Sequence, residues 1–376
     1  MLDCIYCESG QFRPGEGSKE HAILSSLGGR KLSRNICCES CNNRLGKSID
    51  DGLSTELSII STSLNIKTGR NKSAPTQRDA VILDGESYNL LPTGEMLRGK
   101  VKQPLLWKTD EGKTRIRVEA NNKEQALKIV EGKLKSLGKS LSDVEEATIS
   151  HVSKYGAVTE GTFSFDEDDL RSVAKMALTM TATKVSPTRL RSPDFVDVID
   201  YINGSELNVE DIVFADTNSE FPEKYKVSNI NHRLFLYSSK KEKLCLALVE
   251  LFGAFRFSVL LSRSWSGPDI SCCYVIDPVS GDKLDIDIEV NNNLQEIIDT
   301  RICVQSEAIK QISPLIDYIH EFGVQVEEQR IINEAMLRHN VTVIDSNCSD
   351  DFFESVASDL ADMHLKISRT HVSKLV

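Results

Sequence analysis

The first fifty residues of this 376-residue chain contain the side chains best suited to chemistry. Two Cys-x2-Cys pairs bracket an acid–histidine dipeptide, and amide side chains lie near the second pair. The residues are Cys4, Cys7, Glu20, His21, Asn35, Cys38, Cys41 and Asn42. Four thiolates can hold one tetrahedral zinc ion. A carboxylate, an imidazole and amide oxygens are groups that can hold a divalent cation and activate a water molecule for phosphodiester hydrolysis.

The four cysteines at x2 spacing predict one structural zinc site, formed by Cys4, Cys7, Cys38 and Cys41. Cys37 is an alternative to Cys38, although its x3 spacing from Cys41 fits less well. A segment this small buries little apolar surface, so bound zinc would supply much of its folding free energy.

The whole pattern resembles the HNH (ββα-metal) endonucleases, in the zinc-stapled form that has Asn in place of the last His. The resemblance covers only about residues 2–55. It implies a metal-dependent endonuclease that hydrolyses DNA phosphodiester bonds and leaves 5′-phosphate and 3′-hydroxyl ends. The cofactors implied are a structural Zn²⁺ and a catalytic Mg²⁺ or Mn²⁺.

The resemblance also assigns roles to four residues. His21 is the general base that takes a proton from the attacking water, and Asn35 holds the loop and the His backbone in register. Glu20 and Asn42 hold the catalytic cation. Glu20 departs from the commoner Asp at its position, and Asn43 is a second amide beside Asn42.

Other functions remain open on the sequence alone. A non-catalytic zinc-dependent module that binds DNA or protein needs only the cysteines, and RNA is an alternative substrate to DNA. Bacterial chains that join such a module to an unfamiliar body are often phage-defence or restriction-like nucleases. By that analogy the partners would be DNA together with a second copy of the chain or a defence-system protein.

Composition limits the class of protein. No stretch approaches the length of a membrane span, and the N-terminus lacks the basic and apolar regions of a signal peptide. Ten cysteines, five of them before residue 42, indicate a reduced cytoplasmic protein with one metal site rather than a disulfide framework.

Basic residues are concentrated in one stretch of an acidic chain. Residues 98–139 hold twelve basic and five acidic residues, whereas the net charge of the whole chain is −11. The stretch therefore carries +7 and the remainder −18, which localises where a polyanion could bind. The candidate nucleic-acid contacts are a loop near the motif and one helix face, namely Arg30, Lys31, Arg34, Lys128, Lys133, Lys135 and Lys139.

These side chains must be positioned by an α+β protein, with an N-terminal ββα-metal module followed by a mixed α/β body. The predicted division is a nuclease domain at 1–66, a linker at 67–80, and a body at 81–376 with a subdivision near 190–230. The linker assignment follows from its polar residues and its Gly and Pro.

Hydrophobic periodicity predicts the main elements. Helices are expected at 39–57, 123–139 and 166–183, a β-meander at 232–263 with further strands at 273–276 and 284–290, and a strand near 161–165. The C-terminal region is expected to be helical at 305–320, 327–338 and 350–365, interrupted by a strand at 341–344.

Overall fold

The structure is a computed structural model, and it describes residues 1–7, 9–69, 72–83, 85–92, 94–148, 163–206, 212–289 and 293–372. The chain forms two compact units, each built from two separate stretches. Unit 1 comprises Met1–Ala74 and Thr162–Gly323, and unit 2 comprises Pro75–Gly161 and Val324–Val376. The predicted linker at 67–80 contains the first unit boundary, whereas the N-terminal module and a large part of the predicted body belong to the same unit.

The N-terminal module of unit 1 contains two small hairpins and a broken helix. Its elements are β1 (Leu2–Asp3), β2 (Gln11–Phe12), β3 (Glu20–His21), η1 (Ser25–Leu27), β4 (Leu32–Ser33), α1 (Glu39–Leu45), η2 (Gly46–Asp50), α2 (Asp51–Glu56) and α3 (Ser58–Ser63). Strand β1 pairs with β2, and β3 pairs with β4. The predicted helix at 39–57 is present as α1, the π-helical turn η2 and α2, and its leucines at helical spacing are buried.

The body of unit 1 is a six-stranded antiparallel sheet, with the order β10-β13-β12-β11-β14-β15. Its strands are β10 (Val213–Ala215), β11 (His232–Ser239), β12 (Leu244–Leu251), β13 (Phe255–Ser262), β14 (Ile270–Ile276) and β15 (Lys283–Asp287). The predicted meander and its two further strands are confirmed. Both faces of the sheet are covered, which explains why β12 is apolar along almost its whole length and buried throughout.

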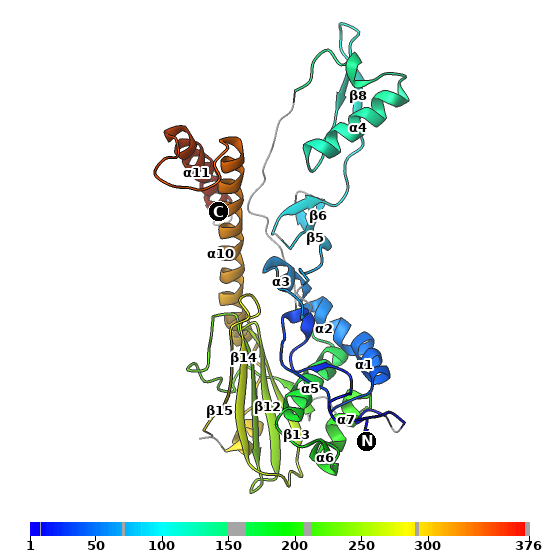
Figure 1. Cartoon of the computed structure of the whole chain (residues 1–376), viewed down its shortest axis with the longest axis vertical. Coiled ribbons are helices and arrows are strands. Elements are labelled where there is room, and N and C mark those ends of the chain that lie inside the picture. Colours follow the sequence, from blue (N-terminus) through cyan, green and yellow to red (C-terminus); the bar gives the residue numbers. More distant parts are fainter. Residues whose placement is uncertain are drawn as a thin grey trace. The chain divides into compact units, whose positions relative to one another are not determined.

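Helix α5 (Glu167–Ala182) lies between the sheet and the N-terminal module, and it contacts strands of both (Figure 1). The helix expected at 166–183 is therefore confirmed, and Asp166 caps its N-terminus. Twelve of its sixteen residues are buried, because it packs on several sides at once. The strand expected at 161–165 begins outside the described residues, and Phe163–Phe165 lie in no strand.

Unit 1 also contains shorter helices, in addition to the first part of the long helix described below. They are α6 (Pro187–Leu190), η4 (Pro193–Phe195), α7 (Val196–Ile202) and α9 (Leu294–Asp299). Apolar residues of the N-terminal module, α5, α7 and one sheet face belong to one continuous core. The module is therefore an integral part of unit 1 and does not have a separate core.

In the described residues of its first stretch, unit 2 contains two small sheets and the helix α4. A three-stranded sheet is formed by β5 (Gln77–Leu83), β6 (Glu86–Leu90) and β7 (Met96–Arg98), and a hairpin by β8 (Leu105–Lys108) and β9 (Thr114–Arg117). Helix α4 (Lys123–Ser136) and the turn η3 (Leu141–Asp143) follow. Asn122 caps α4, which ends three residues before the predicted limit.

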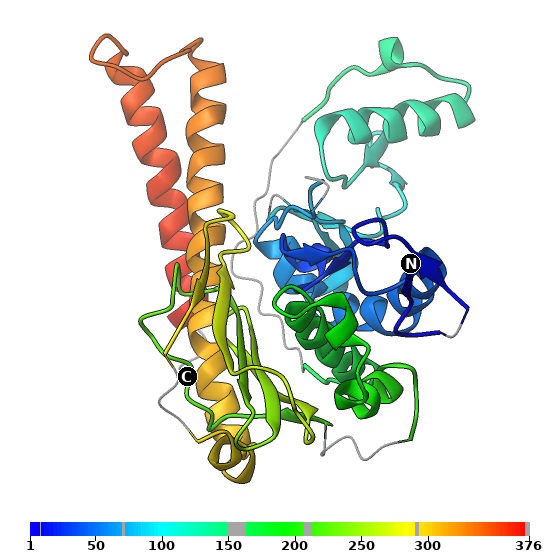
Figure 2. The ribbon, with the colours of Figure 1, turned by 60° about the horizontal axis from the view of Figure 1, so that its bottom comes forward.

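The C-terminal region is a pair of long helices, α10 (Gln305–Arg338) and α11 (Asp350–Val372), which lie side by side in Figure 2. Arg338 of α10 pairs with Asp359 of α11, and Glu328 pairs with His364. The prediction of two helices within 305–338 is wrong, because Gly323 lies inside one continuous helix. An interior glycine costs only about 1 kcal/mol relative to Ala, which neighbouring helix formers can offset.

The strand predicted at 341–344 is also wrong. This segment is part of the short connection between α10 and α11, and it pairs with no strand in the described part of the chain. Val343 and Ile344 are 69% and 47% exposed, so the apolar run that suggested a strand has no surface to pack against. Among the described residues, no helix combines the length and apolar character that crossing a membrane requires.

A buried histidine joins the sheet to the N-terminal module. His232 on β11 is fully buried, and its Nδ1 accepts a hydrogen bond from the Phe252 N–H at 3.1 Å. Its Nε2 therefore carries the proton and donates to the carbonyl oxygen of Leu27 at 2.8 Å. Burial lowers the pKa of His232 to about 4, so the folded state holds this imidazole neutral.

We expect unit 1 to lose stability in mild acid through His232. The unfolded histidine titrates near pH 6.5, so its contribution is complete above that pH and decreases as the pH falls towards 4, by about 3 kcal/mol in all. Urea unfolding at pH 7 and pH 4.5 would measure this loss. His232→Gln keeps a donor for Leu27 and should remove about 2–3 kcal/mol of the pH dependence; an equal pH dependence in both proteins would contradict the assignment.

Candidate metal centre and active site

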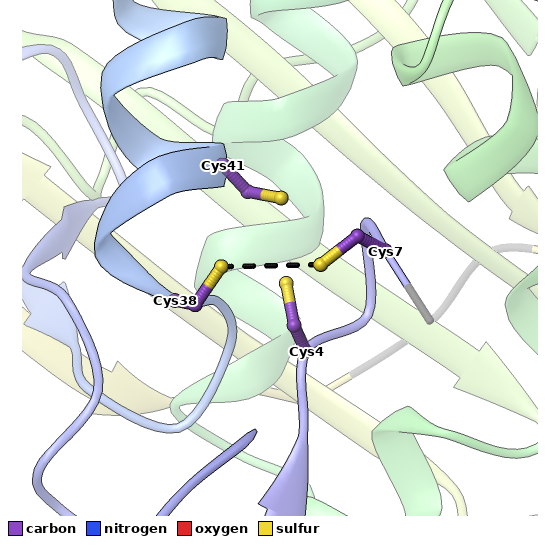
Figure 3. A group of neighbouring side chains, drawn as sticks. All are labelled: Cys4, Cys7, Cys38 and Cys41. Atoms are coloured by element: carbon purple, nitrogen blue, oxygen red, sulfur yellow. Dashed lines mark hydrogen bonds between the residues drawn. The ribbon is translucent and has the colours of Figure 1, made fainter. Parts of the chain in front are cut away.

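The four cysteine sulfurs predicted to hold zinc lie together (Figure 3). Their Sγ atoms are all within 4.8 Å of one another, and the Sγ atoms of Cys7 and Cys38 are 3.9 Å apart. A tetrahedral zinc site with Zn–S bonds of 2.3 Å requires sulfur–sulfur distances of about 3.8 Å. The cluster therefore fits a structural zinc ion.

Local structure explains how the sequence forms this cluster. The β1–β2 hairpin carries Cys4, and the backbone N–H of Cys4 donates to Gly10 at 2.6 Å, which closes the turn that holds Cys7. Cys38 is the N-cap residue of α1 and Cys41 lies in its first turn, where the helix dipole favours thiolates. A side chain at position 10 would place its Cβ 2.8 Å from the Cys38 sulfur, so this close approach requires glycine.

The structure distinguishes Cys38 from Cys37. Cys37 is fully buried and does not belong to the cluster, and its thiol donates to Oε2 of Glu20 at 3.7 Å. Burial raises the pKa of the Cys37 thiol strongly, with the nearby Glu20 carboxylate adding to the effect, so the group stays a protonated donor. Cys38, which the x2 spacing from Cys41 predicted as the zinc ligand, is therefore the cysteine that belongs to the cluster.

Glu20 and His21 occupy β3, where successive side chains point to opposite sides. Glu20 is 3% exposed, and its Oε1 pairs with Nζ of Lys175 on α5 at 2.7 Å. Because Oε2 accepts from Cys37, both carboxylate oxygens are engaged. A divalent cation at Glu20 would have to replace the weak thiol contact.

Lys175 is the residue of this site that the sequence reasoning missed. It is 1% exposed and also pairs with Oδ2 of Asp50 at 2.5 Å, while Ser172 donates to Oδ1 of Asp50 at 2.7 Å. Burial alone would lower the pKa of Lys175, but the carboxylates of Glu20 and Asp50 outweigh it and raise the pKa to about 12. A lone lysine within the apolar run 173–178 was the available signal, since a buried charge requires partners.

His21 lies on the other side of β3 and is partly exposed. Burial lowers its pKa, and the positive charges of Lys175 and Lys19 lower it further. The ring therefore stays neutral at physiological pH, as a proton acceptor must. The backbone of Gly69 lies close to the His21 ring. A Cβ atom added to Gly69 would be 3.6 Å from Nε2 of His21.

The two predicted asparagines contact the chain around the β3–β4 hairpin. Oδ1 of Asn35 accepts from the N–H of Gly15 at 2.7 Å, and its backbone carbonyl accepts from Arg191 at 3.1 Å. Nδ2 of Asn42, on α1, donates to Oγ of Ser18 at 2.7 Å. Asn42 thus lies against the segment that leads directly into Glu20-His21, whereas Asn35 fixes a neighbouring loop.

The three basic residues of the predicted phosphate-binding loop are all engaged within unit 1. Arg30 donates to the carbonyls of Thr68 and Lys67 at 2.9 and 3.3 Å, and so holds the loop that passes His21. Lys31 pairs with Asp285 at 2.5 Å with its side chain only 12% exposed. Arg34 donates to the carbonyl of Gly17 at 3.4 Å. Phosphate binding by Lys31 would require it to leave Asp285.

The four predicted lysines on or after α4 belong to unit 2. Lys128 pairs with Glu124 at 2.8 Å one helical turn away, and Lys133 is half-buried. Lys135 and Lys139 are exposed. Within the described residues, the last three make no ion pair, so they are available to an anion.

Comparison with known proteins agrees with this geometry. Residues 4–58 match the model of the HNH endonuclease family. The chain thus contains an HNH module with a four-cysteine cluster, and the resemblance seen in the sequence is confirmed. No curated protein and no solved structure was found to match the chain. The match implies a nucleic-acid substrate and nuclease activity in general. It does not extend beyond residue 58, so it gives no information about the remainder of the chain.

Proposed function

We propose that this chain is a metal-dependent HNH endonuclease that hydrolyses DNA phosphodiester bonds. The observation that carries the proposal is the position of His21 on the β3–β4 hairpin of a matched HNH module, with a lowered pKa and a partly exposed ring. His21 accepts the proton of the attacking water. Asn42 orients the segment that carries it, and Asn35 holds the adjacent loop.

Glu20 and Asn42 are the proposed ligands of a Mg²⁺ or Mn²⁺ ion. Their carboxylate and amide oxygens suit a hard cation. Glu20, Asp50 and Lys175 together carry a net charge of −1, so the buried group still attracts a positive ion. When bound, the cation stabilises negative charge that develops on the phosphate oxygens.

Cys4, Cys7, Cys38 and Cys41 bind zinc, and the thiols that this requires fit a reduced cytoplasmic setting. The α4 lysines, and the loop residues Arg30, Lys31 and Arg34, supply phosphate contacts. A role in phage defence, with a second copy or a defence-system partner, is supported by the family resemblance alone.

A non-catalytic zinc-dependent binding module is the second candidate. It is favoured by the engagement of both Glu20 oxygens with Lys175 and Cys37. Such a module would bind nucleic acid or protein and would not depend on His21.

The test is cleavage of plasmid DNA, single-stranded DNA and RNA with Mg²⁺ or Mn²⁺. Replacing His21 by Ala should lower the rate at least about 100-fold, because a positioned general base contributes about 10²–10⁴, while zinc content and fold stay unchanged. His364→Ala is the matched control, since His364 is an exposed histidine of the C-terminal helix pair. Equal rates for wild type and His21→Ala would exclude the mechanism, and no cleavage of any substrate would favour the binding module.

A further inference from the structure

The β8–β9 hairpin of unit 2 exposes an unusual amount of apolar surface. Three consecutive residues of β8 are exposed, with Leu105 at 61% and both Leu106 and Trp107 at 44%. The other tryptophan of the chain, Trp265, is 1% exposed and buried in unit 1. Leu106 lies on the opposite face of the strand from the other two. Single exposed apolar residues are ordinary, but two large ones on the same strand face, one of them tryptophan, indicate a binding surface.

Strand register places arginines beside this tryptophan. Arg115 pairs directly with Trp107, and Arg117 pairs with Leu105. Because side chains alternate along a strand, these four residues share one face of the hairpin. Arg117 forms an ion pair with Glu119 at 3.2 Å, whereas Arg115 is exposed and has no ion-pair partner in the part of the chain that the structure describes.

Charge identifies the kind of occupant. Residues 102–118 contain five basic and two acidic residues, and both acids lie in the turn between the strands. Lys102, Lys113 and Arg117 pair with acidic side chains of unit 2, so Arg115 is the cation on the Trp107 face that has no ion-pair partner among the described residues. An apolar protein segment would leave Arg115 without a counter-charge, whereas a nucleic-acid strand supplies a phosphate for this arginine and flat bases for the indole. Stacking requires bases that are not already stacked within a duplex.

We propose that this face, formed by Leu105, Trp107, Arg115 and Arg117, binds a single-stranded or locally opened nucleic-acid segment by stacking a base on Trp107. The inference rests on the proposed nuclease function and deepens it. It adds that the substrate has exposed bases as well as a phosphodiester bond that is cleaved. The surface lies in unit 2 and uses none of the residues of the HNH module (β8 in Figure 1).

The two tryptophans allow a direct test. The full chain is titrated with a single-stranded oligonucleotide and with the duplex of the same sequence, without added Mg²⁺ or Mn²⁺, while tryptophan fluorescence is followed. Stacking should quench the emission of Trp107 with the single strand more than with the duplex. The buried Trp265 should not respond, so a Trp107→Phe protein should lose the quenching.

Affinity provides the second readout. Trp107→Ala should weaken binding of the single strand about tenfold, as expected for the loss of one base–aromatic stack. Phe353→Ala is the matched control, because Phe353 is also an aromatic residue 44% exposed, but on α11. Arg115→Gln should lower the slope of log affinity against log salt by about 0.7, the value for one phosphate of a single strand.

Each outcome decides the inference. Unchanged affinity in Trp107→Ala with no quenching in wild type would overturn it, as would loss of self-association in Trp107→Ala without any effect on oligonucleotide binding. Quenching by the single strand in a wild-type protein that cleaves nothing would support the hairpin surface and refute the nuclease. Plasmid cleavage that is unaffected by Trp107→Ala, together with no quenching, would refute the surface and leave the nuclease in place.

Discussion

Replacing Cys38 with Ser is expected to reduce the zinc content from one ion per chain to none and to unfold the N-terminal module. Cys38 supplies one of four sulfurs within 4.8 Å of one another. Structural zinc contributes on the order of 10 kcal/mol to the folding of small zinc modules. Because the module shares one continuous core with α5 and the sheet, its unfolding should destabilise unit 1 as a whole. Metal analysis and thermal unfolding would measure the two effects.

The neighbouring cysteine provides the control for this experiment. Cys37→Ser alters a fully buried thiol one residue away, but it leaves all four sulfurs of the cluster in place. This protein should keep its zinc and lose only the weak contact with Glu20. Zinc retained in Cys38→Ser and lost in Cys37→Ser would exchange the two assignments.

Replacing Lys175 with Met should destabilise unit 1 by about 3–5 kcal/mol, because it leaves the buried carboxylate of Glu20 and the partly buried carboxylate of Asp50 without their common cation. The methionine fills a similar volume, so lost charge pairing and not a cavity would cause the effect. Activity should fall as well, since Glu20 would lose the contact that fixes its carboxylate. The midpoint of urea unfolding and the rate of plasmid cleavage are the measurements.

Two further variants separate this explanation from a general effect of removing a lysine. Lys184→Met also removes a lysine with two acidic partners, Asp285 and Asp287, but at a more exposed position, so it should cost no more than about 1 kcal/mol. Adding Glu20→Gln and Asp50→Asn to Lys175→Met removes the unpaired charges and should restore much of the stability. A triple variant as unstable as Lys175→Met would show that packing, and not charge, is responsible.

Local spacing was sufficient to predict much of this site. The x2 spacing of the cysteines and the helical period after Glu39 depend only on neighbouring residues, and the structure agrees with both. The meander of unit 1 was equally predictable, since long apolar runs separated by turns are local signals. Lys175 was not predictable in this way, because its partner Asp50 lies 125 residues earlier in the chain.

The division of the chain was harder to predict for the same reason. A polar segment at 67–80 signals an interruption, but it does not show that the chain later returns to complete the first unit. The long helix α10 and the exposed residues at 341–344 show the opposite error, because the helix break and the short strand predicted there are absent from the structure.

The discontinuity of unit 1 has a consequence for synthesis on the ribosome. The HNH module is translated first, but α5 and the sheet that complete its core follow only after the whole inserted stretch Pro75–Gly161. At about 5–20 residues per second, the interval from Ala74 to the end of β14 lasts roughly 10–40 s. For about the first half of that time Glu20 has no lysine partner, because Lys175 of α5 has not yet been made, and the contacts still to form are distant in sequence, which slows folding. The newly made chain therefore completes the core around its HNH module late, when most of its length has already been translated.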